Sequence, residues 1–105
     1  MKILWSPLAV ERLEEISEFI ASDKPSAADK WEDSIFSKVD LLKSNAEMGR
    51  IVPELEIPSV RELIFGNYRI IYRYTGNTIK ILTVRNFRQL LPVHEGNRDG
   101  GELYS

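Results

Sequence analysis

The 105-residue sequence contains no cysteine, which excludes disulfide bonds, thiolate metal sites and thiol nucleophiles. It has a single histidine, His94, and it contains neither a glycine-rich phosphate loop nor a cluster of metal-ligating side chains. We therefore expect no metal and no other cofactor. No apolar run approaches the roughly 20 residues that a helix needs to cross a bilayer, and the N-terminus lacks an apolar core of signal-peptide length. These absences favour a cytoplasmic protein that makes no contact with a membrane.

Charge is distributed unevenly along the chain, although the net charge is only −2. Residues 59–91 carry six basic side chains and one acid, a net charge of +5, whereas residues 1–58 carry seven basic and twelve acidic side chains, a net charge of −5. Residues 92–105 have a net charge of −2. In the basic segment, tyrosines and β-branched residues lie between the arginines. Such a surface suits an anionic partner, and the acidic N-terminal half does not.

The N-terminal half predicts one strand followed by two helices. The short apolar run at residues 2–5 indicates a strand. Ser6 and Pro7 are typical of a helix start, because serine caps an unpaired N–H and proline has none to pair. Apolar residues at steps of three and four then predict helices over residues 7–22 and about 25–44. The short break between the helices predicts an antiparallel hairpin.

The C-terminal half predicts strands. Residues 45–60 contain glycine and prolines and are predicted to form a loop. Two dipeptides, Gly66-Asn67 and Gly76-Asn77, are typical of two-residue hairpin turns. They separate three strands, predicted at about residues 60–65, 68–75 and 78–85.

These elements predict a single α+β domain over residues 1–91. In it, the helical hairpin packs on a three- to four-stranded antiparallel sheet, and the N-terminal strand lies at one edge. Residues 92–105 are rich in glycine, asparagine and aspartate, and we expect them to be loosely ordered without a partner.

Alternation along the strands predicts two unlike faces of the sheet. On the middle strand one face carries Tyr68, Ile70, Tyr72 and Tyr74, and the other carries Arg69, Ile71 and Arg73. On the last strand one face carries Ile79, Ile81, Thr83 and Arg85, and the other carries Lys80, Leu82 and Val84. One face must cover the hairpin, so we expect the opposite face to expose apolar surface together with arginines. A patch of that kind marks a partner site.

Five short motifs occur in a fixed order: Trp5-Ser6-Pro7-x-Ala9, Gly49-Arg50-x-Val52-Pro53-Glu54, Arg61-Glu62-Leu63, Tyr68-Arg69-Ile70-Ile71-Tyr72-Arg73 and Ile81-Leu82-x-Val84. Together they resemble the RelE/ParE toxin superfamily, and more closely its ParE-like, plasmid-stabilisation branch. The resemblance covers residues 1 to about 91. It implies the toxin of a type II toxin–antitoxin operon, neutralised by an antitoxin that wraps it, so that the two form a hetero-oligomer.

The superfamily contains two activities. RelE-like members cut mRNA on the ribosome, and ParE-like members inhibit DNA gyrase without nuclease chemistry. A nuclease needs cations beside the scissile phosphate and a group that transfers a proton. The resemblance offers Arg69, Arg85 and Arg88 as the cations, with His94 or Tyr104 for proton transfer and Glu54 as a base.

The proton-transfer group is missing where it is expected. Asn86 stands where many relatives have histidine, and asparagine is neither an acid nor a base near neutral pH. The acidic net charge also disfavours a ribosome binder. We therefore favour a gyrase inhibitor, with an mRNA endonuclease and a non-toxic or retargeted interaction module of the same fold as alternatives.

Six residues of the basic segment are candidates for binding the antitoxin or the target: Arg61, Arg69, Arg73, Arg85, Phe87 and Arg88. Alternative roles stay open for several of them. Arg69 and Arg73 could be solvated strand residues paired with Glu54, Glu56 or Glu62. The lone histidine could be a solvated tail residue.

Overall fold

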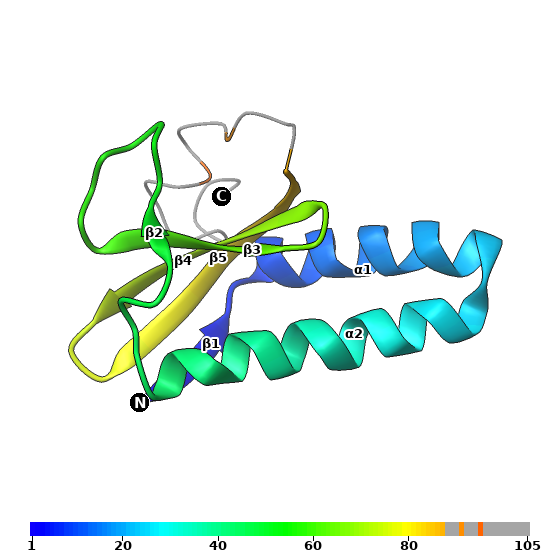
Figure 1. Ribbon diagram of the computed structural model, residues 1–105, viewed down its shortest axis with the longest axis horizontal. Coiled ribbons are helices and arrows are strands. Elements are labelled where there is room, and N and C mark those ends of the chain that lie inside the picture. Colours follow the sequence, from blue (N-terminus) through cyan, green and yellow to red (C-terminus); the bar gives the residue numbers. More distant parts are fainter. Residues whose placement is uncertain (88–90, 92–94, 96–105) are drawn as a thin grey trace.

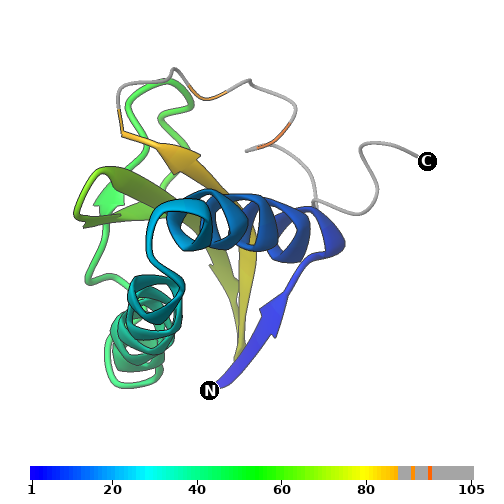
Figure 2. The same cartoon turned by 90° about the vertical axis from the view of Figure 1, so that its right-hand side faces the viewer.

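The computed structural model describes residues 1–87, 91 and 95. The elements follow in the order β1 (Lys2–Trp5), α1 (Pro7–Asp23), α2 (Pro25–Asp40), η1 (Leu41–Lys43), β2 (Arg50–Ile51), β3 (Val60–Phe65), β4 (Tyr68–Thr75) and β5 (Thr78–Asn86). Helices α1 and α2 form an antiparallel hairpin that lies on one face of the sheet (Figures 1 and 2). The predicted α+β class, N-terminal strand and helical hairpin are confirmed. None of the described residues belongs to a helix long and apolar enough to cross a membrane.

The sheet differs from the prediction at both edges. It has five strands in the order β1-β5-β4-β3-β2 and not three to four. Strand β1 pairs with β5 in parallel, so the sheet is mixed, and the chain between them, which contains the helical hairpin and β2, β3 and β4, supplies the crossover that parallel pairing requires. At the other edge Arg50 and Ile51 pair antiparallel with Glu62 and Arg61, inside the segment predicted to be a loop. Two residues are too few to show an alternating pattern.

Ser6 joins the start of α1 to the sheet. Its hydroxyl accepts a hydrogen bond from the Ala9 N–H at 3.0 Å, which confirms the predicted cap. The same hydroxyl donates to the Leu82 carbonyl at 2.9 Å, and the side chain is buried. A cap of this kind contributes about 1 kcal/mol. It also fixes where the hairpin leaves β1.

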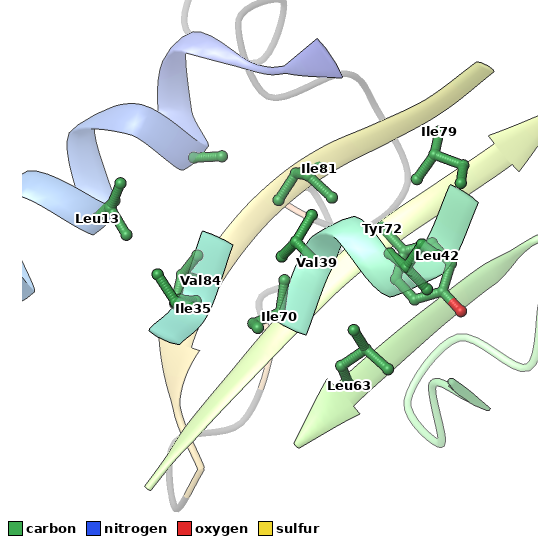
Figure 3. Packing of buried hydrophobic residues seen from close by; sticks show 11 residues of the cluster. Leu13, Ile35, Val39, Leu42, Leu63, Ile70, Tyr72, Ile79, Ile81 and Val84 are labelled. Carbon is green, nitrogen blue, oxygen red and sulfur yellow. The ribbon is translucent and has the colours of Figure 1, made fainter. Parts of the chain in front are cut away.

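The main core lies between the hairpin and the sheet. Figure 3 shows the cluster, which contains Leu13 of α1, Ile35 and Val39 of α2, Ile70 of β4 and Ile81 of β5. All five side chains are buried. Each comes from the apolar stripe or strand face that the sequence predicts, so the alternation of β4 is confirmed.

A β-bulge changes the alternation in β5. Ile71 pairs with Thr83 whereas Tyr72 pairs with Ile81, so Leu82 has no opposite residue. Leu82 and Thr83 therefore both lie on the face away from the hairpin, and Val84 returns to the main core. The prediction that Thr83 and Arg85 share a face with Ile79 and Ile81, and that Val84 faces the other way, is wrong for this reason.

A second, smaller core covers the face of the sheet opposite the hairpin. It contains Val52, Val60, Ile71, Leu82 and Leu91. The segment after β2 folds back over this face and adds Leu55 and Ile57. Because these apolar side chains are buried, the prediction that this part of the face exposes apolar surface is wrong.

Candidate functional site

Basic side chains of β4 and β5 lie opposite one another in two cross-strand pairs. Arg69 lies opposite Arg85, and Arg73 lies opposite Lys80. All four lie on the face away from the hairpin, because Ile71 and Leu82 mark that face. Like charges directly opposite each other destabilise a sheet unless they are neutralised. Each pair therefore needs anionic partners.

Two other sequence candidates are placed differently. Arg61 lies beside Tyr72 on the hairpin side of the sheet. Its guanidinium donates to the carbonyls of Pro58 and Gly49, both at 3.1 Å, and lies 5.8 Å from the centroid of the Tyr74 ring. Arg61 is therefore separated from the other arginines by the sheet itself. Phe87 follows β5 and is exposed.

Three candidates, Arg88, His94 and Tyr104, lie outside the described residues.

Arg69 is the centre of a buried ion-pair network. Its Nε donates to Glu62 at 2.7 Å, and its Nη1 and Nη2 donate to the two oxygens of Glu54 at 2.7 and 2.8 Å. Glu62 also binds the Nε of Arg50. The side chain of Arg69 is only 5% exposed and that of Glu62 is 0% exposed. Arg69 is therefore a buried ion-pair residue and not the solvated strand arginine of the alternative prediction.

The same network makes Glu54 unsuitable as a general base. Hydrogen bonds from Arg69 lower the pKa of Glu54 to about 2 from 4.5, and the partner carboxylate in turn raises the pKa of Arg69. The Leu91 N–H donates to Glu54 at 2.9 Å, so both carboxylate oxygens are occupied. A carboxylate with so low a pKa is a weak base near neutral pH. Glu54 serves to hold Arg69 and the chain after β5.

Arg85 is neutralised by a different carboxylate. Its Nη1 lies 3.4 and 3.2 Å from the two oxygens of Glu95, and the Thr83 hydroxyl donates to the same carboxylate at 3.1 Å. The guanidinium of Arg12, in α1, also lies 3.7 Å from Glu95. Glu95 is buried, with 2% exposure. Neither Arg12 nor Glu95 is predicted from the sequence as a site residue, although Arg12 is the only basic residue of α1.

A groove of about 400 Å³ lies beside Arg85, between α1 and the ends of β4 and β5. It is lined by Arg12, Glu15, Ile16, Phe19, Tyr68, Val84, Arg85 and Asn86. Phe19 is 75% exposed and Phe87, directly after the lining residues of β5, is 46% exposed. We call Phe19, Tyr68, Arg85, Asn86 and Phe87 the α1–β5 surface. Phe19 is the most exposed of the large apolar side chains in the described part of the chain.

Aromatic side chains next to an arginine are typical of protein-binding hot spots. The acid–base groups near the arginines are mostly engaged, because the described carboxylates Glu54, Glu62 and Glu95 all bind arginine. The α1–β5 surface is therefore better suited to binding than to proton transfer.

The chain is similar to known proteins in sequence and in fold. Residues 3–91 match the profile of the family described as "ParE toxin of type II toxin-antitoxin system, parDE". A protein of Sinorhizobium fredii (strain NBRC 101917 / NGR234) named "Putative toxin Y4kP" is 36% identical over 93 residues, which cover 87% of this chain and 93% of that protein. A chain of the solved "Chromosomal ParDE TA system from P. aeruginosa" is similar with a TM-score of 0.68 and 27% identity, over 82% of this chain and 95% of that chain.

Proposed function

Because the chain belongs to the ParE toxin family of type II toxin–antitoxin systems, we propose that it inhibits DNA gyrase by binding it. A cognate antitoxin binds the toxin and neutralises it in a hetero-oligomer. The protein acts in the cytoplasm, without a cofactor, and stabilises the plasmid or chromosomal region that encodes the pair. The family membership supports the toxin and the antitoxin partner, and the site supports inhibition by binding.

One observation carries the proposal. At the ends of β4 and β5 the arginines are neutralised by carboxylates of the same chain, while the aromatic side chains beside them are exposed. A nuclease would need the reverse, with accessible cations and an available proton donor. Asn86 supplies no such donor, and Glu54 is occupied.

The α1–β5 surface is the proposed target contact. Phe19 and Phe87 supply apolar area, and Arg85 lines the groove beside them. Arg73 lies on the face of the sheet away from the hairpin, and we propose it as a contact of the antitoxin. Buried Arg69 acts on both contacts indirectly, by holding the residues around it.

Supercoiling of relaxed plasmid by purified gyrase tests the proposal. We expect increasing amounts of the protein to inhibit supercoiling, and preincubation with the antitoxin to restore it. Full gyrase activity at a large excess of folded protein would contradict the proposal. Growth arrest after induction of the protein alone separates a toxin from a non-toxic interaction module, which would leave growth unchanged.

An mRNA endonuclease is the second candidate, because Arg69 and Arg85 lie side by side on the last two strands. Primer extension on ribosome-bound mRNA tests it. New 5′ ends that appear only with the protein would favour the nuclease. No new ends, together with inhibited supercoiling, would favour the gyrase inhibitor.

A further inference from the structure

The carboxylate of Glu95 occupies a pocket made by three residues that are distant in sequence. Arg12 comes from α1, and Thr83 and Arg85 come from β5. Each of them directs a donor at Glu95, and the carboxylate is buried. Two guanidinium groups and a hydroxyl around one carboxylate constitute an anion pocket.

Glu95 makes long contacts with the two arginines of this pocket. The contacts between Arg85 and Glu95 measure 3.2 and 3.4 Å, and Arg12 is 3.7 Å away. The neighbouring arginine of the sheet, Arg69, binds both oxygens of Glu54 at 2.7 and 2.8 Å. Shorter, two-oxygen contacts are the stronger ones. Glu95 is therefore held less tightly than the carboxylate beside it.

Two donors of the pocket remain unused. The Nε atoms of Arg12 and Arg85 are buried and have no hydrogen-bond partner in the part of the chain that the structure describes. Buried donors without a partner are rare in native proteins and call for an explanation. Both arginines line the groove beside the pocket, so a group that enters the groove approaches them.

The groove favours one class of ligand. Its other lining residues include Ile16, Phe19, Tyr68 and Val84, which offer apolar contacts. Helix α1 carries four glutamates, namely Glu11, Glu14, Glu15 and Glu18, and a single basic residue, Arg12; Glu15 lines the groove. These glutamates would repel a polyphosphate backbone, with its several negative charges, more strongly than a single carboxylate next to an apolar side chain.

We propose that Arg12, Thr83 and Arg85 form a binding pocket for a carboxylate side chain in an acidic, aromatic-bearing peptide segment of a partner protein, and that Glu95 is its internal competitor. The partner's carboxylate replaces Glu95 and its aromatic ring packs in the groove beside Phe19. This inference concerns the chemistry of the groove and holds whether or not gyrase is the target.

Titration of the full chain with small probes tests the pocket. The probe is acetyl-Glu-Phe-amide, the matched control is acetyl-Gln-Phe-amide, and inorganic phosphate represents the nucleic-acid class. Binding is followed through the NMR signals of the Arg12 and Arg85 Nε–H groups. We expect Glu95→Gln to bind the glutamate probe about tenfold more tightly than the parent, because the internal carboxylate no longer competes.

Asp33→Asn removes the same charge from the exposed surface of α2, outside the groove lining, and should bind like the parent. An equal gain in affinity in Glu95→Gln and Asp33→Asn would show that only net charge matters and would overturn the proposal. Tighter binding of phosphate than of the glutamate probe would also overturn it, in favour of a nucleic-acid ligand. If Glu95→Gln does not fold, Arg85→Lys takes its place, since lysine has no Nε–H donor of this geometry. Probe binding by Arg85→Lys that equals the parent's would overturn the proposal.

Discussion

Arg69 and Arg85 are direct neighbours across β4 and β5, and different segments of the chain neutralise them. Arg69 is bound by Glu54 and Glu62, from the loop and β3, whereas Arg85 is bound by Glu95, beyond the sheet. These ion pairs offset the repulsion between the two guanidinium groups, and they attach two segments of the chain to one face of the sheet. The predictions below follow from these attachments and from the residues that position them.

Arg69→Met is expected to lower the free energy of unfolding by about 3–5 kcal/mol, because it leaves the buried carboxylate of Glu62 without its main partner. Urea denaturation followed by circular dichroism measures the change. Lys30→Met, at an exposed position of α2, is the matched control and should change stability by no more than about 0.5 kcal/mol. Similar stability of the two variants would show that the network contributes little.

The Glu54–Arg69 pair makes stability depend on pH. The pKa of Glu54 is about 2 in the folded chain against an ordinary 4.5, so the ionised form stabilises the fold. Its contribution, at most about 3 kcal/mol, is complete above pH 4.5 and is lost as the pH falls toward 2. The difference in unfolding free energy between the parent and Glu54→Gln should therefore shrink over that range. A difference that stays constant from pH 7 to pH 2 would contradict the assignment.

Ser6→Ala removes both hydrogen bonds of the buried hydroxyl, to the Ala9 N–H and to the Leu82 carbonyl. We expect a loss of about 2 kcal/mol, since a helix cap and a buried acceptor lose their partner together. Thermal unfolding measures it. Ser34→Ala, on the exposed face of α2, is the control and should be nearly neutral. Equal losses in the two variants would mean that the cap is unimportant.

Two glycines are required for different reasons. A Cβ at Gly49 would lie 2.5 Å from the Glu62 carbonyl oxygen and 2.7 Å from the Tyr72 hydroxyl, whereas a Cβ at Gly76 would touch nothing within 4 Å. Gly76 has a φ of 53°, which costs an alanine about 1 kcal/mol. We expect Gly49→Ala to cost about 1–3 kcal/mol. Asparagine should be tolerated better than alanine at Gly76 and worse at Gly49, and thermal unfolding of the four variants tests this.

Phe87→Ala should weaken gyrase inhibition without weakening the fold, because the side chain is exposed after the end of β5. We expect at least about a tenfold increase in the concentration that halves supercoiling, which is typical of a hot-spot residue. Leu41→Ala, which also truncates an exposed apolar side chain, is the control and should inhibit like the parent. Unchanged inhibition by Phe87→Ala would remove Phe87 from the target contact.

The sequence predicts most of the fold because its signals are local. Apolar periodicity locates both helices, Ser6 and Pro7 locate the start of α1, and the two Gly-Asn turns locate the hairpins of β3, β4 and β5. The bulge at Leu82 leaves no local signal, because an inserted residue keeps the strand apolar and changes only which face each later side chain occupies. That single residue is why the face of Arg85 was predicted wrongly.

The partners of the arginines are even less predictable. The sequence predicts Glu54 and Glu62 as alternative partners of Arg69, but burial of the whole network depends on how the loop after β2 folds over the sheet. The pairing of Arg85 with Glu95 and Arg12 joins three segments that no periodicity connects. Charge counts locate a basic segment, and only the tertiary fold decides which of its cations remain accessible.

The parallel pairing of β1 with β5 has a consequence for synthesis of the chain on the ribosome. The first strand finds its neighbour only after residues 78–86 have been made, so the hydrogen bonds of β1 belong to the last steps of folding. The helical hairpin is synthesised much earlier, and its apolar stripe stays exposed until the strands that cover it have been made. A chain that stalls on the ribosome before β5 is synthesised therefore exposes apolar side chains of the hairpin. The domain is complete only when β5 has been made and has paired with β1 and β4.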